Sequence, residues 1–275
     1  MGKIFTNILA LIDLPDDPEL CFRSAIDTAN RLESNLHVLY RSRMEDNEMQ
    51  EGKGDYPNII NLALLNIYRP MLDKHRSLHI HIVDEPTGKS AFLYARKNKI
   101  DLTLIWKTDG SFLSAPIAMA RCCRLSHKLS CPVLYLPGQV SIRNIKNVIL
   151  PVKQALPAGK LVLAVQLAKL CKAKIHLVGV ANYAKTAKKD QYLFKTCQLL
   201  RNNTNLEVDC KMVKGVGLAR ATAKYVITVD AGLILVCTGK KLLLLSVACS
   251  LLTRPTSGLA KIPIMTVPPE QLYVL

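Results

Sequence analysis

The stretches NILALID (residues 7–13) and NVILPVK (residues 147–153) resemble one buried strand that occurs twice in the chain. Five apolar residues follow one another in the first copy with no polar residue between them, which is typical of a parallel strand covered on both faces. The copies differ at their carboxyl ends, where Asp13 of the first is replaced by Lys153 in the second. The pair therefore predicts a duplicated α/β unit whose copies differ in charge at one place.

The residues after the first strand carry the signals of a helix start. Asp16 or Asp17 can cap the helix, and Pro18 suits its first turn. Apolar residues then recur at spacings of four, four and three, at Cys21, Ala25, Ala29 and Leu32. A second apolar strand follows in NLHVLY (35–40), so the order strand–helix–strand is predicted.

The same order begins again after NVILPVK. A helical apolar pattern leads into KIHLVGV (174–180), which is a second strand of the same kind. His37 and His176 occupy matching positions within the two second strands. The beginning of the second half thus repeats the beginning of the first.

The repeat continues to the end of each half. DLTLIW (101–106) matches GLILVC (232–237), and CPVLYLP (131–137) matches IPIMTVP (262–268). In both halves 31 positions separate the first residue of the fourth strand motif from the first proline of the fifth. Such an unbroken interval supports a duplication.

Between these motifs each half has a strand of another kind. LHIHIV (78–83) and LEVDCKMV (206–213) alternate apolar and polar residues, as a less buried strand does. We therefore expect the third strand at an edge of each sheet. With helices between the strands, the pattern predicts two domains of five strands and four helices, 1–140 and 141–275.

Composition supports an α/β protein and shows an uneven charge. Hydrophobic residues make up 49% of the 275 residues and aromatic residues only 5%, so aliphatic side chains form the core. The chain has 37 Lys and Arg and 21 Asp and Glu. Residues 1–140 contain 17 of the basic and 16 of the acidic residues, so residues 141–275 contain 20 basic and 5 acidic residues. The basic second half favours an anionic partner, or else its lysines only maintain solubility.

Cysteine usage and hydropathy indicate the cytoplasm. The nine cysteines are an odd number without a C-x-x-C pair, and the adjacent Cys122 and Cys123 would point in different directions on a helix. No signal peptide pattern is present. The most apolar run, LLLLSVACSLL (242–252), has 11 residues, too few to span a bilayer, and predicts a buried helix.

The strand that ends in Asp13, the motif AxRLxSxLHVL (29–39) and the closing CPVLYLP resemble the universal stress protein family. The second half resembles the same family, so the likeness covers nearly the whole chain. It implies two tandem Rossmann-like domains, each with a five-stranded parallel sheet in the order 3-2-1-4-5 and helices on both faces. In that order, ligands bind outside the carboxyl ends of strands one and four.

Nucleotide-binding members of this family carry, after strand four, a glycine, two residues, a second glycine, nine residues, and then glycine with serine or threonine. In the first half Gly110 takes the first place, but Leu113 and Cys123 take those of the later glycines. In the second half Gly239 remains and Leu242 takes the next place. Both phosphate-binding loops therefore depart from the pattern. Glycine lets the backbone approach a phosphate closely, so the loss of these glycines predicts weakened phosphate binding.

The resemblance still indicates where a ligand would bind. The candidate ligand-binding residues are Asp13, Thr108, Gly110, Ser111, Lys153, Thr238, Gly239 and Lys240. In ATP-binding members the aspartate after strand one meets the nucleotide, a part that Lys153 cannot take. Lys153 beside Lys240 predicts a cationic second crevice that suits a phosphate or carboxylate, unless these lysines face water.

The sequence contains no catalytic constellation. His79 and His81 share one strand face, as a metal pair would, but no third ligand follows from the sequence, and no metal is expected. Nucleic-acid binding through the basic half is a lesser alternative, because its aromatic residues are not interleaved with its lysines.

The leading hypothesis is a non-catalytic cytoplasmic protein that acts, by resemblance, in stress adaptation. It would bind an unknown small anionic ligand or a protein partner and need no cofactor. Its two domains would pack as an internal pseudo-dimer through residues 133–136 and 264–267, and a homodimer is a further option. The alternative is a module that binds ATP or AMP, with weak ATPase activity at the Asp13 crevice.

Overall fold

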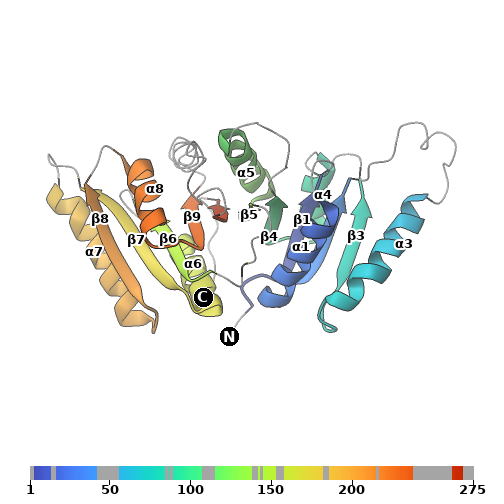
Figure 1. Ribbon diagram of the computed structural model, residues 1–275, viewed down its shortest axis with the longest axis horizontal. Coiled ribbons are helices and arrows are strands. Elements are labelled where there is room, and N and C mark those ends of the chain that lie inside the picture. The colour runs from blue at the N-terminus through green and yellow to red at the C-terminus, as the bar shows by residue number, and fades with distance from the viewer. Residues whose placement is uncertain are drawn as a thin grey trace. The chain divides into compact units, whose positions relative to one another are not determined.

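The computed structural model consists of two compact α/β units, Lys3–Ser111 and Phe112–Leu275 (Figure 1). It describes residues 3–13, 17–41, 56–83, 86, 89–106, 115–137, 142, 145–152, 158–181, 186–214, 217–237 and 262–268. The α/β class is as predicted. The predicted domain boundary between residues 140 and 141 stays a prediction, since the compact units divide earlier in the chain.

Strands and helices alternate along the first unit. Its elements are β1 (Asn7–Ile12), α1 (Pro18–Leu32), β2 (Asn35–Tyr40), α3 (Tyr56–Tyr68), the short 3₁₀ helix η1 (Arg69–Met71), β3 (Leu78–Ile82), α4 (Lys89–Lys97) and β4 (Leu102–Trp106). The strands are parallel and lie in the order β3-β2-β1-β4. The alternating third strand is at an edge of this sheet, as predicted.

The first strand and helix form for the reasons visible in the sequence. All five apolar residues at the end of β1 are buried. Asp17, and not Asp16, caps α1: its side chain accepts a hydrogen bond from Leu20 N at 3.2 Å, and Pro18 occupies the first turn. The helix ends at Leu32, and its C-cap residue Glu33 has a left-handed φ of 53°. The four predicted apolar positions of this helix are all buried.

The two faces of the first sheet are covered by different helices. On one face Phe22 of α1 stacks on Tyr68 of α3, with ring centroids 4.4 Å apart, and meets the edge of Tyr40 from β2. On the other face His37 of β2 hydrogen-bonds to Tyr94 of α4. Helices therefore lie on both faces, because each strand alternates its side chains between them.

The second unit begins with one helix and one strand and then repeats the order of elements of the first. Its elements are α5 (Ala115–Leu129), β5 (Val133–Leu136), β6 (Asn147–Pro151), α6 (Ala158–Cys171), β7 (Lys174–Ala181), α7 (Thr186–Asn203), β8 (Val208–Lys214), α8 (Leu218–Thr228), β9 (Leu233–Cys237) and β10 (Ile264–Val267). The parallel strands β8-β7-β6-β9-β10 have the predicted order 3-2-1-4-5. The helix predicted between the last two strands lies outside the described residues.

The strand β5 joins this second sheet. It runs antiparallel to β10, with Tyr135 opposite Ile264 and Val133 opposite Thr266. The predicted contact between the two fifth strands, 133–136 and 264–267, is therefore present. Strand β5 thus belongs to the second unit.

The two units share details that the strand order alone does not require. Asn7, the first residue of β1, donates its side-chain amide to Asn98 O, just after α4, at 3.0 Å. Asn147, the first residue of β6, donates in the same way to Val229 O, just after α8, at 2.6 Å. In each unit an asparagine thus satisfies a carbonyl group at a helix end, where no helical partner remains.

No helix in the described part of the chain is both long and apolar enough to cross a membrane. The apolar run at 242–252, predicted to be a buried helix, lies outside the described residues.

Candidate functional site

The carboxyl ends of β1 and β4 form the place where the strand order predicts a ligand. Strand β1 lies between β2 and β4, and Leu11 is opposite Ile105. The chain leaves β1 in one direction and returns to β4 on the other side, which makes this the switch point of the sheet. Asp13 follows β1 directly and stands at this edge, as predicted.

The carboxylate of Asp13 is held by an arginine of the neighbouring strand. Arg41 follows β2, and its backbone N–H donates to Ile12 O at 3.0 Å, which continues the β1–β2 register by one residue. This places Arg41 Nη1 3.6 Å from Asp13 Oδ1. The Asp13 side chain is 19% exposed and that of Arg41 is 43% exposed. The aspartate is therefore shielded and its charge balanced.

The last residue of β4 brings an unsatisfied polar group to the same edge. Trp106 is buried, and its Nε1 has no hydrogen-bond partner in the described part of the first unit. Trp106 and Leu104 leave the same face of β4, and Leu104 is paired with Ala10 of β1. Asp13 is three residues after Ala10, so its side chain leaves the opposite face of the sheet. A buried N–H without an acceptor is costly, so this group favours an acceptor that binds here.

The second unit has a buried lysine at the corresponding edge. Lys160, in the first turn of α6, is only 3% exposed, and its Nζ donates to Pro151 O, the last residue of β6, at 3.4 Å. The sequence analysis did not identify this lysine, because a lysine in a first helical turn is usually exposed. Its position agrees with a cationic crevice in the second unit, which was predicted from other lysines.

Asp13 is the only predicted ligand-binding residue within the described part of the chain. Thr108, Gly110, Ser111, Lys153, Thr238, Gly239 and Lys240 lie outside the described residues. Their roles, and the loss of the phosphate-binding loops, stay predictions.

His37 and His176 belong to the core of their units. His37 Nδ1 lies 2.9 Å from the hydroxyl oxygen of Tyr94, and His176 Nδ1 lies at the same distance from that of Tyr225. Burial, reinforced by the nearby His79 and His81, lowers the pKa of His37 from 6.5 to about 4. Burial also lowers the pKa of His176. Both rings are thus neutral structural groups at pH 7.

His79 and His81 share one exposed face of β3, as predicted. The ring of His79 stacks on that of His37 with centroids 4.7 Å apart and an angle of 22°, while His81 meets the edge of Tyr94. No group of three or more His, Cys, Asp or Glu side chains in the described residues could hold a metal ion.

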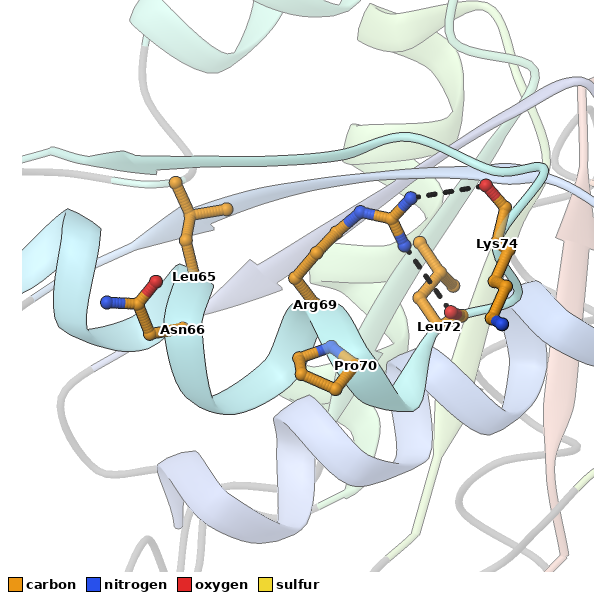
Figure 2. A pocket seen from close by; sticks show the side chains of 6 residues that line it. All are labelled: Leu65, Asn66, Arg69, Pro70, Leu72 and Lys74. Carbon is orange, nitrogen blue, oxygen red and sulfur yellow. Dashed lines mark hydrogen bonds between the residues drawn. The ribbon is translucent and has the colours of Figure 1, made fainter.

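A hollow of about 500 Å³ lies beside the end of α3, away from these groups (Figure 2). It is lined by Leu65, Asn66, Arg69, Pro70, Leu72 and Lys74. The guanidinium of Arg69 donates to the carbonyl oxygens of Leu72 at 3.4 Å and Lys74 at 3.3 Å, as Figure 2 shows. Arg69 therefore holds the turn that leads to β3.

Comparison with known proteins identifies the fold. No family model and no curated protein matches this sequence. Among solved structures, a protein assigned to the universal stress proteins from Pseudomonas aeruginosa matches with a TM-score of 0.66 and 14% identity, over 98% of this chain and 95% of that one. A universal stress protein from Archaeoglobus fulgidus matches with a TM-score of 0.61 and 11% identity, over 94% and 96%.

The same fold occurs in a different setting. The cytoplasmic domain of a prokaryotic cation chloride cotransporter matches with a TM-score of 0.57 and 11% identity, over 95% of this chain and 94% of that one. This protein thus has the Rossmann-like α/β fold of the universal stress proteins. At such identities the likeness establishes the fold, and the function has to be argued from the site.

Proposed function

We propose that this protein is a non-catalytic stress-response protein of the cytoplasm, which binds a small anionic ligand or a protein partner. The fold that it shares with universal stress proteins supports a role in stress adaptation. The eight cysteines in the described residues are all free thiols, which supports a reducing compartment. Binding without catalysis agrees with the neutral, hydrogen-bonded state of both core histidines.

The ion pair between Asp13 and Arg41 carries the proposal. A nucleotide that used Asp13 as the resemblance implies would have to share this carboxylate with a guanidinium 3.6 Å away. Leu113 and Leu242 also replace glycines that would let the backbone approach a phosphate. Together these features support a crevice that has lost tight nucleotide binding.

The buried Lys160 supports the anionic character of the ligand. A lysine amine held at the carboxyl end of β6 provides N–H donors near the place where a phosphate or carboxylate would bind. The predicted cationic residues Lys153 and Lys240 would act in the same direction. The ligand of the second unit is therefore proposed to be a small phosphate or carboxylate.

The antiparallel pair of β5 and β10 supports a further part of the proposal, an internal pseudo-dimer of the two sequence repeats. Because β5 and β10 pair within one chain, a second copy of the chain is not needed for this contact. Sedimentation as a monomer would agree with the internal pseudo-dimer, whereas a stable dimer would show that two chains associate.

A second candidate is a module that binds ATP or AMP and hydrolyses ATP weakly at the Asp13 crevice. The observation in its favour is the buried Nε1 of Trp106, which has no partner in the described residues and lies at the carboxyl end of β4, on the face of the sheet opposite to Asp13. A hydrogen-bond acceptor of a bound nucleotide could satisfy it.

Isothermal titration of the full chain with ATP and with AMP separates the two candidates. The leading proposal expects no micromolar binding of either nucleotide. Micromolar binding that is lost in Asp13→Ala, and kept in the surface control Glu19→Gln, would overturn it in favour of the second. Glu19 suits as the control because it is paired with Arg23 on the exposed side of α1.

A further inference from the structure

Two cysteines meet where α7 packs on the edge strand β8 of the second unit (Figure 1). Cys197 extends from α7, is buried, and donates its thiol to Val208 O at 3.9 Å. One turn later, Arg201 Nε donates to the same carbonyl oxygen at 2.8 Å. Two hydrogen bonds to one carbonyl group fix this side of the helix on the first residue of β8.

Cys210 brings the second sulfur to the same interface. It follows Val208 by two residues, so its side chain leaves the same face of β8. That face is covered by α7, since a Cβ added at the adjacent Gly179 would lie 3.0 Å from Leu193 of this helix. Cys197 Sγ reaches the carbonyl oxygen of Val208 on this face, so the two sulfur atoms belong to the same interface between α7 and β8. Cys210 is only partly buried, and so a small reagent can reach the pair from its side.

The surroundings of Cys210 favour its protonated thiol at neutral pH. Burial, together with Cys197, raises the pKa of Cys210 to about 11, and the charge of Arg201 opposes this shift. Because the thiolate is the reactive form, reaction with an oxidant is slow at neutral pH and accelerates as the pH rises. A pair of this kind responds to sustained oxidation and not to a brief pulse.

We propose that Cys197 and Cys210 form a peroxide-sensitive thiol pair that closes to an intramolecular disulfide between α7 and β8. The thiolate of Cys210 attacks one oxygen of hydrogen peroxide, the O–O bond breaks, and a sulfenic acid forms with release of hydroxide, which takes up the proton that the thiol lost. The sulfur of Cys197 then displaces hydroxide from the sulfenic sulfur, which forms the S–S bond and releases a second water once the Cys197 proton is taken up. In sum, two thiols and one peroxide give one disulfide and two waters, and a dithiol reverses the change.

The adjacent Cys122 and Cys123 do not offer the same chemistry. Both are buried on α5, and burial raises the pKa of Cys122 far above its usual value. Neighbouring positions on a helix also point in different directions. The pair that the structure brings together is thus distant in sequence, and it does not depend on which ligand the protein binds.

The chain allows a direct test, because trypsin cleaves after Lys195, Arg201 and Lys211. The two cysteines then lie in separate peptides, TCQLLR (196–201) and NNTNLEVDCK (202–211). The folded full chain is treated with hydrogen peroxide at mildly alkaline pH, its remaining thiols are blocked, and it is digested without reductant. Mass spectrometry is expected to find the two peptides joined, about 2 Da lighter than their sum, and separated again by dithiothreitol.

Two variants control this experiment. Cys210→Ser removes the exposed sulfur and is expected to abolish the joined peptide, whereas Cys171→Ser leaves the pair intact and is expected to retain it. Circular dichroism establishes that both variants are folded. Recovery of both peptides from wild type as blocked free thiols, or a linkage found only between two chains, would overturn the proposal.

Discussion

The Nδ1 atom of His37 lies 2.9 Å from the hydroxyl oxygen of Tyr94, and their ring centroids are 5.7 Å apart. His176 and Tyr225 repeat this arrangement with the same two distances. In each unit the histidine is on the second strand and the tyrosine is on the helix after the third. Asn147 Oδ1 accepts a hydrogen bond from His176 Nε2, so that Nδ1 accepts the proton of Tyr225. A polar pair thus ties a helix to the sheet at the same place in both units.

Removing the hydroxyl group of either tyrosine should destabilise its unit. In Tyr225→Phe the Nδ1 of His176 stays buried without a donor, so we expect the free energy of unfolding to fall by about 1–2 kcal/mol. Tyr94→Phe should act in the same direction. Urea unfolding followed by circular dichroism measures both, with the exposed Tyr192→Phe as the control. Equal stability of all three variants and wild type would show that these hydrogen bonds have no net effect.

The buried His37 should make the protein sensitive to acid. Its pKa is about 4 in the folded chain against 6.5 when exposed, so between these values the unfolded chain binds more protons. The contribution of His37 to the free energy of unfolding is therefore fully present above pH 6.5 and is lost as the pH decreases towards about 4. His37→Gln, which cannot titrate, should lose less stability than wild type between neutral pH and about pH 5. His127→Gln, on the exposed side of α5, should behave as wild type, and an unchanged pH dependence in His37→Gln would refute this explanation.

The sequence predicts the strands and helices of both units because burial leaves a regular pattern. The unbroken apolar runs of β1 and β6, the alternation in β3 and β8, and the cap before α1 each follow from local residues. The order 3-2-1-4-5 came from resemblance, and the second sheet has it in full. These features depend on periodicity or on a known framework, and neither requires side-chain geometry.

The contacts of the candidate site could not be predicted in the same way. Arg41 reaches Asp13 because the register of β1 and β2 aligns the residues that follow them, and a register is a property of two distant segments. Lys160 is buried although its position in a first helical turn suggests exposure. Cys197 and Cys210 share an interface only because α7 packs on β8. Each of these depends on which segments become neighbours, which periodicity does not report.

Gly232 should be intolerant of any side chain. An added Cβ would lie 2.7 Å from Ile145 Cα and 3.1 Å from Lys146 N, and backbone atoms cannot rotate away as the end of a side chain can. We expect Gly232→Ala to lower the free energy of unfolding by about 1–3 kcal/mol. Gly217→Ala is the matched control, because no atom lies within 4 Å of its added Cβ. Chemical unfolding of both variants checks the difference, and equal stability would contradict the close approach at Gly232.

The end of α6 offers a position where glycine should be better than the native residue. Lys172 has a φ of 53°, and its N–H and that of Ala173 donate back to Lys169 O and Ala168 O, as in a helix that ends in the left-handed conformation. A Cβ is unfavourable there, so Lys172→Gly should raise the free energy of unfolding by about 0.5–1 kcal/mol. Lys169→Gly removes the same charge inside the helix and should lower it by about 1 kcal/mol. Both variants lose one lysine, so changes of opposite sign in the free energy of unfolding, measured with urea, can arise only from the backbone. A loss of stability in both variants would show that the left-handed residue is not strained.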